Sequence, residues 1–148
     1  MPQHALTVLL RLEEGGSPPP QVLFLRGEAL KELGRYSEAI APLREASEQS
    51  PDNVAVWLAL GWCYKRMGRV DMAIQSLEEA LEADPSQAIV HYNLACYWSL
   101  AGSKRQSLIH LSQAIDIEPD YRDLIADESD FDPIRSDPAF QALASVIV

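Results

Sequence analysis

The chain has 148 residues, 22 acidic and 12 basic side chains, and a net charge of −10. This length suits one domain, and an apolar fraction of 47% excludes wholesale disorder. The acidity makes a nucleic-acid partner unfavourable, and no apolar run approaches the roughly 20 residues of a membrane helix. With two cysteines and no recognisable signal peptide, we expect a cytoplasmic protein with no membrane partner.

The first predicted helix covers residues 3–14, which are apolar on more than one side. A run of glycine, serine and proline at 15–20 ends it. One apolar side must cover the next element, whereas the other is either packed locally or exposed. An exposed edge formed by Leu6, Leu9 and Leu10, or the groove described below, would pair two copies, so a self-assembling homodimeric structural module stays open as an alternative function.

From residue 20 onward, the sequence repeats with a period of 34 residues. Such a period indicates an array of supersecondary units that stack on one another. The matching columns are Gly34/Gly68/Gly102, Pro51/Pro85/Pro119, Leu43/Leu77/Leu111, Ala46/Ala80/Ala114, Gly27/Gly61/Ala95 and Ala39/Ala73/Ser107.

Each repeat is predicted to form two helices joined at a glycine. In the middle repeat, Gly68 breaks the first helix, and Pro85 ends the second because proline cannot continue a helix. Gly61 and Ala73 are small enough for the two helices to approach closely. The first helix has one packing face, formed by Trp57, Leu60, Gly61 and Tyr64.

Residues 54–87 resemble the tetratricopeptide (TPR) repeat, through the pattern Trp57-x2-Leu60-Gly61-x2-Tyr64 followed by Ala73, Leu77, Ala80 and Pro85. Residues 20–53 and 88–121 resemble it with departures at Leu23, Arg26, His91, Ala95 and Ser107. The resemblance implies an all-α fold, a right-handed α-solenoid of three helix-turn-helix repeats with a helical cap at each end. We expect one domain over residues 1–148, with the N-terminal cap at 1–19 and the C-terminal cap at 122–148.

The C-terminal stretch is predicted to close the array. A short amphipathic helix is expected from Asp120 to about Asp127, a helical turn near 133–136 and a last helix near 138–146. The segment resembles the tail that ends many bacterial TPR arrays. In that reading Arg135 interacts with nearby acidic charge, and the apolar plug consists of Phe131, Ile134, Phe140 and Leu143.

The sequence contains no constellation that indicates catalysis, so we expect no enzyme and no cofactor. The histidines His4, His91 and His110 are scattered without ligand spacing. Cys63 and Cys96 are predicted to be free thiols. The carboxylates near residue 130 lack the glycine and the bidentate glutamate of a calcium loop, so we expect no metal site; these are Asp127, Glu128, Asp130 and Asp132.

A second face recurs on the first helix of each repeat and is not needed for packing within the repeat. First helices line the concave side of TPR arrays, so the resemblance places this face in a peptide-binding groove. An alternative is that some of these side chains are buried between repeats or by the C-terminal segment. The predicted groove residues are Phe24, Glu28, Lys31, Leu58, Trp62, Lys65, Arg66, Ile89, Tyr92 and Cys96.

The predicted function is therefore a protein–protein interaction scaffold that binds a peptide or protein segment in this groove. Aromatic residues supply much of the binding energy of interfaces, and the basic edge favours an acidic group in the ligand. The chain should not be a clamp for chaperone carboxylates. The positions that match the family's clamp are occupied by Phe24, Glu28, Ala59, Ile89 and Asn93.

Overall fold

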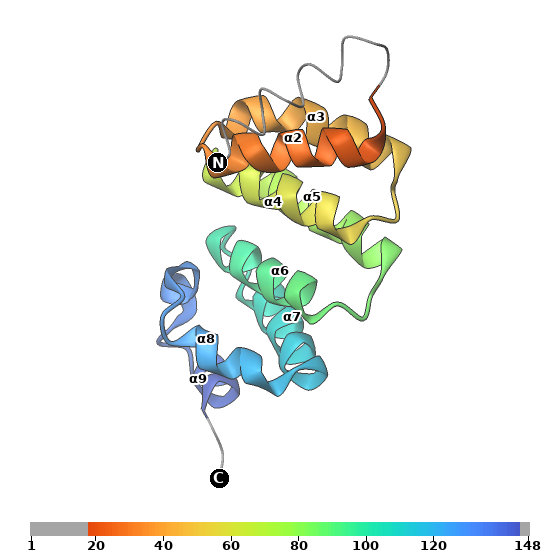
Figure 1. Cartoon of the computed structure of the whole chain (residues 1–148). Helices are drawn as coiled ribbons and strands as arrows, with labels where there is room; N and C mark the ends of the chain where they lie inside the picture. The colour runs from red at the N-terminus through yellow and green to blue at the C-terminus, as the bar shows by residue number, and fades with distance from the viewer. Residues whose placement is uncertain (1–17, 146–148) are drawn as a thin grey trace. The chain divides into compact units, whose positions relative to one another are not determined.

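The computed structural model describes residues 18–145, which contain helices and no strand. The helical cap predicted for residues 1–19, with its apolar edge, lies almost wholly outside the described residues. The helices (Figure 1) are α2 (Pro20–Glu32), α3 (Tyr36–Gln49), α4 (Val54–Arg66), α5 (Val70–Ala83), α6 (Ala88–Leu100), α7 (Lys104–Ile117), η2 (Pro119–Tyr121), α8 (Arg122–Ile125), η3 (Ser129–Ile134) and α9 (Pro138–Ala144).

The chain divides into two compact units, Met1–Asp84 (unit 1) and Pro85–Val148 (unit 2), which are described separately. Unit 1 contains the helix pairs α2/α3 and α4/α5, and α3 also packs against α4. Unit 2 contains the pair α6/α7 and the short helices that follow it. That the whole chain forms one domain stays a prediction.

Each helix pair is joined at a glycine with a positive φ: 76° at Gly34, 78° at Gly68 and 88° at Gly102. A side chain is strained in this left-handed region, which explains why glycine recurs there. In the first turn, the amide of Arg35 donates to the carbonyl of Leu30 at 2.9 Å, and the amide of Gly34 donates to Lys31 at 2.9 Å. These two hydrogen bonds together form the Schellman motif, and equivalent pairs of hydrogen bonds occur at the turns of Gly68 and Gly102.

The repeated small and apolar columns form the core of the helix pairs. Their members are completely buried at 0% exposure: Ala39, Ala73, Leu43, Leu77, Leu111, Ala46, Ala80 and Ala114. Ser107, a departure from the repeat pattern, is also fully buried. Its hydroxyl donates a 2.7 Å hydrogen bond to the carbonyl of Ala95, so the polar group is satisfied.

The glycine column at 27 and 61 marks where the helices of a pair approach closely, and its two members differ in tightness. We expect Gly27→Ala to lower the free energy of unfolding by about 1–3 kcal/mol. An added Cβ would lie 2.5 Å from Cδ2 of Leu43, which is fully buried. Gly61→Ala is the matched control, because its Cβ would meet Cδ2 of Leu77 at 3.1 Å. Alanine gains about 1 kcal/mol of helix propensity over glycine, and this gain and the mild contact roughly cancel. We therefore expect Gly61→Ala to leave the free energy of unfolding nearly unchanged. Urea unfolding compares the two, and equal effects would contradict this reading.

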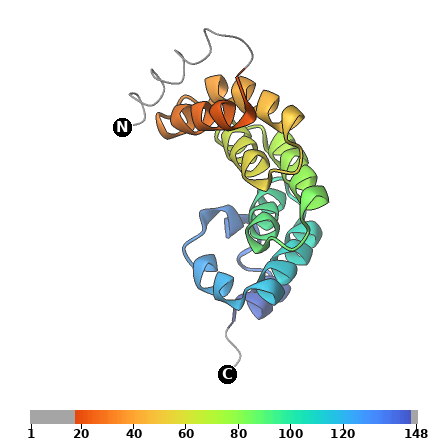
Figure 2. The same ribbon diagram turned by 45° about the vertical axis from the view of Figure 1, so that its right-hand side comes forward.

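In unit 2, the residues after α7 fold back on the helix pair: η3 packs on α6, while η2 and α9 pack on α7 (Figure 2). The predicted plug residues Phe131, Ile134 and Phe140 are buried, at 0%, 6% and 2% exposure, whereas Leu143 is half-buried. Arg135 donates to a carboxylate oxygen of Asp132 and to the carbonyls of Ile125 and Glu128. Arg135 therefore holds parts of the C-terminal segment together through two carbonyls as well as through one acidic side chain.

The helices of this segment differ from the sequence prediction. Instead of one helix from Asp120 to about Asp127, a 3-10 turn at Pro119–Tyr121 precedes the four-residue α8. The second 3-10 helix begins at Ser129, earlier than predicted, because the Glu128 side chain caps it by accepting from the amide of Asp130. The last helix starts at Pro138 as predicted, with Asp137 as its N-cap.

Candidate functional site

Seven of the ten predicted groove residues lie in unit 1, on helices α2 and α4, which contact each other. We call this set the α2/α4 face. It combines an apolar and aromatic part with charged side chains, and its members are Phe24, Glu28, Lys31, Leu58, Trp62, Lys65 and Arg66. Phe24 and Leu58 are half-buried, and Trp62 is 41% exposed.

The exposed indole of Trp62 is accompanied by two cations from its own helix. The Lys65 ammonium lies 5.4 Å from the ring centroid of Trp62, and the Arg66 guanidinium lies 6.0 Å from it. Arg66 also lies 5.5 Å from the ring of Tyr36, at the start of α3. Cation–π contacts of this kind restrict the side chains, so the aromatic surface is partly preorganised. The sequence prediction missed Tyr36, although its place directly after the turn at Gly34 is a local signal.

Glu28 and Lys31 form an ion pair at 3.1 Å on α2. Both side chains are about a quarter exposed, at 28% and 24%, so the pair contributes little to stability. The two charges offset each other, so the net positive charge of the α2/α4 face comes from Lys65 and Arg66.

Cys63 lies under this face and is fully buried. Burial raises the pKa of its thiol to about 11; the charges of Lys31 and Glu28 act on it in opposite directions. The thiol is protonated at neutral pH and is a poor nucleophile. Neither Cys63 nor Cys96 forms a disulfide, as predicted.

The other three predicted groove residues lie on α6 in unit 2, and only Ile89 is accessible there, at 41% exposure. Tyr92 and Cys96 are 5% and 2% exposed. The ring of Tyr92 lies 5.0 Å from that of Tyr121 and 5.8 Å from that of Phe131. Tyr92 and Cys96 are therefore not part of an open surface, because the C-terminal segment covers them, which is the alternative left open above for some of the groove residues.

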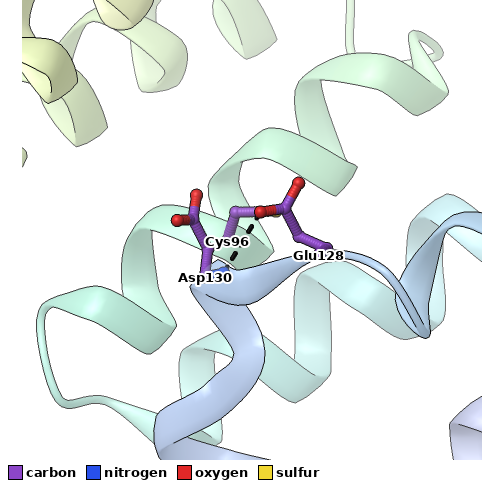
Figure 3. A group of neighbouring side chains, drawn as sticks. All are labelled: Cys96, Glu128 and Asp130. Carbon is purple, nitrogen blue, oxygen red and sulfur yellow. Dashed lines mark hydrogen bonds between the residues drawn. The ribbon is translucent and has the colours of Figure 1, made fainter.

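Beneath that segment, Cys96 meets two carboxylates (Figure 3). One ligand atom each from Cys96, Glu128 and Asp130 lies within 4.8 Å of the other two. Cys96 comes from α6, whereas the carboxylates come from the start of η3. Of the four carboxylates weighed against a calcium loop, only these two belong to the group, and the thiol beside them lies more than thirty positions earlier in the sequence.

His91 occupies the same repeat position as Trp57 and reproduces its hydrogen bond. The indole Nε1 of Trp57 donates to the carbonyl of Pro51 at 2.8 Å, and Nε2 of His91 lies 2.9 Å from the carbonyl of Pro85. Since a carbonyl only accepts, Nε2 of His91 carries a proton, and Nδ1 of neutral His91 accepts. The Nδ1 of His110, 3.2 Å away, is therefore the donor of that bond.

This histidine pair makes stability depend on pH. Burial and the neighbouring His91 lower the pKa of His110 from 6.5 to about 4. Between these values the unfolded chain binds a proton that the folded chain excludes, so stability is full above pH 6.5 and falls as the pH drops toward 4. We expect a loss of about 2 kcal/mol over this window, which is less than the full difference between the two pKa values would give, because water screens the half-buried His110 ring. Urea titrations at several pH values would show it, and His110→Gln should flatten that part of the profile. An unchanged profile in the variant would contradict this assignment.

No helix in residues 18–145 is long and apolar enough to cross a membrane. Comparisons with known proteins agree with the repeat architecture. Two family models described as tetratricopeptide repeat match the sequence, one at residues 4–54 and one at residues 30–95. No curated protein sequence matches the chain significantly.

Solved structures share the fold. The crystal structure of YrrB, described as a TPR protein with an unusual peptide-binding site, has a TM-score of 0.78 at 24% identity and covers 86% of this chain and 66% of YrrB. MamA AMB-1 has a TM-score of 0.69 at 26% identity, covering 76% of this chain and 66% of MamA. MamA MSR-1 has a TM-score of 0.72 at 25% identity, covering 81% of this chain and 69% of MamA. The chain thus spans slightly less than two thirds of the first two proteins.

These findings confirm the predicted fold class, an all-α TPR solenoid built from helix-turn-helix repeats. Matching family models, similar solved structures and the repeated helix pairs with their glycine turns lead to one assignment. The chain belongs to the tetratricopeptide repeat family.

Proposed function

We propose that this chain is an interaction scaffold, not an enzyme, and that it binds an apolar and acidic segment of another protein across the α2/α4 face. The observation that carries the proposal is Trp62, a large aromatic side chain that is 41% exposed on a helix of the repeat core. A tryptophan is costly to leave in water, and buried tryptophans dominate the binding energy of many interfaces.

The surroundings of Trp62 support this role. Phe24 and Leu58 are half-buried on the same pair of helices, so a ligand side chain would find further apolar area beside the indole. Lys65 and Arg66 lie against the ring, as the cation–π distances of 5.4 and 6.0 Å record. A ligand that covers Trp62 would meet both cations in a partly desolvated setting, where charge-assisted hydrogen bonds to carboxylates are strongest.

The distribution of charge favours the same ligand. Residues 116–137 hold nine acidic and two basic side chains, a net charge of −7 out of −10 for the whole chain. The acidity is therefore concentrated in the C-terminal part, and the α2/α4 face carries Lys31, Lys65 and Arg66 against Glu28 alone. Its side chains do not match the clamp for chaperone carboxylates, so the ligand we expect is an internal segment and not a chaperone tail.

A peptide selection tests this proposal. The full chain is immobilised and used to select binders from a random peptide library, and the binders are then measured by fluorescence anisotropy at two salt concentrations. We expect enriched peptides that combine aromatic or aliphatic residues with Asp or Glu, and affinities that fall with added salt. Selection on Arg66→Glu should lose these peptides. Enrichment of basic peptides, or equal binding to Arg66→Glu, would reject the proposal.

A further inference from the structure

The group formed by Cys96, Glu128 and Asp130 combines the donor atoms of a metal site in a sheltered place. Cys96 is 2% exposed and Asp130 is 8% exposed, and Glu128 is half-buried, so one side of the group stays open to an entering ion. Their ligand atoms lie within 4.8 Å of one another. A tetrahedral ion with bonds of about 2.0–2.3 Å holds its ligand atoms roughly 3.5 Å apart. Small side-chain rotations would close the remaining gap.

A second observation, independent of these three residues, also indicates a missing ligand. The hydroxyl of Tyr92 is buried and has no hydrogen-bond partner among the described residues. Tyr92 is 5% exposed and lies one helical turn before Cys96 on α6. The ring of Tyr92 lies 5.8 Å from that of Phe131, which directly follows Asp130 in η3, so the Tyr92 side chain lies at the same contact between α6 and η3 as this group. Leaving a buried hydroxyl without a hydrogen bond costs about 1–3 kcal/mol of stability. A bound species that forms a hydrogen bond with it would remove this cost.

The donor set selects the ion. A thiolate is a soft ligand that magnesium and calcium avoid, whereas two carboxylates are poor partners for copper(I). Zinc accepts sulfur and oxygen together, and many zinc sites have three protein ligands and a water in the fourth position. We propose that unit 2 binds Zn²⁺ through the Cys96 thiolate and the carboxylates of Glu128 and Asp130, with the Tyr92 hydroxyl bonded to a zinc-bound water.

Binding would displace the thiol proton of Cys96 into solvent, and the thiolate would form the Zn–S bond. The ion would join α6 to the start of η3, two elements whose contact keeps the C-terminal segment over Tyr92 and Cys96. Zinc would therefore stabilise the covered state of this part of unit 2.

Metal titration of the full chain tests the site. The protein, without a histidine tag, is freed of metal with a chelator and titrated with Zn²⁺ in competition with a chromophoric chelator. We expect a single high-affinity site and a higher melting temperature with zinc. Titration with Co²⁺ should give the charge-transfer absorption of a cobalt–thiolate bond. Absence of that absorption, or of zinc binding, would overturn the proposal.

Variants locate the site. Cys96→Ser should abolish the cobalt–thiolate absorption and weaken zinc binding by more than the roughly 10–100-fold that loss of an outer-shell partner causes. Cys63→Ser is the matched control, since Cys63 is equally buried but lies in unit 1, and it should change neither. Equal zinc affinity of Cys96→Ser and the native chain would show that the metal binds elsewhere and would overturn the proposal.

Two further variants test the site even if Cys96→Ser fails to fold. Glu128→Gln keeps a side-chain oxygen that can accept from the amide of Asp130, so the cap of η3 survives while the charge is lost. We expect it to fold and to bind zinc at least tenfold more weakly. Tyr92→Phe removes only the unpaired hydroxyl, so it should leave the metal-free protein no less stable and still weaken zinc binding. Unchanged affinity in Glu128→Gln would reject the site even if Cys96→Ser fails to fold.

Discussion

Phe131→Ala is expected to lower the free energy of unfolding of unit 2 by about 3–5 kcal/mol. Phe131 is 0% exposed, and its ring lies 5.8 Å from Tyr92 on α6 and 5.4 Å from Phe140 on α9. Truncation would leave a cavity between α6 and the C-terminal segment, which are far apart in the sequence, and no neighbour could fill it without moving that segment.

Amide hydrogen exchange measures this effect segment by segment, because it reports local as well as global unfolding. Protection should fall in α6 and α7 and stay unchanged in α2 to α5. Leu124→Ala is the control: Leu124 belongs to the same C-terminal segment but is 52% exposed, so it should cost no more than about 0.5 kcal/mol. If Phe131→Ala left the protection of α6 and α7 unchanged, the C-terminal segment would not be part of the core of unit 2.

Trp62→Ala is expected to weaken binding of a selected peptide by about 2–4 kcal/mol, roughly 30- to 900-fold. The variant removes the aromatic surface and also the contacts that hold Lys65 and Arg66 over it. Helicity and melting temperature should stay nearly unchanged, since Trp62 is 41% exposed and lies outside the buried columns.

Fluorescence anisotropy with labelled peptide gives the affinity, and circular dichroism gives the stability. Leu25→Ala is the matched control, because Leu25 is an exposed apolar residue of α2, at 55%, that does not belong to the α2/α4 face. It should bind the peptide normally. If Trp62→Ala instead unfolds, Trp62 is part of the core. If the variant folds and binds as well as the native chain, the ligand lies elsewhere.

Much of the fold follows from periodicity in the sequence. The glycines at 34, 68 and 102 all adopt a positive φ, and the columns at 43, 77 and 111 and at 46, 80 and 114 are completely buried. These features are local or recur at a fixed spacing, so one period locates them all. The half of the candidate site on α2 and α4 is equally local, because residues four apart on a helix share a face.

The other half of the candidate site could not be predicted in this way. Tyr92 and Cys96 occupy the same repeat positions as Leu58 and Trp62, yet they are buried, since the segment after Pro119 returns to cover them. Its path depends on two 3-10 turns and on the capping oxygen of Glu128, which obey no period. The contact between His91 and His110 is likewise a matter of packing between helices.

The 34-residue period is enough to predict that this protein is an array of helix pairs, where each pair turns, and which columns form its core. The sequence encodes these features several times, because every repeat must bury the same face. Which aromatic residues remain exposed, and which chemical groups lie together, depends instead on the tertiary packing. Trp62 stays in water beside Arg66, whereas Tyr92 and Cys96 lie under two carboxylates from a distant segment. The direction of a single non-repeating segment produces that difference, and it is encoded only once.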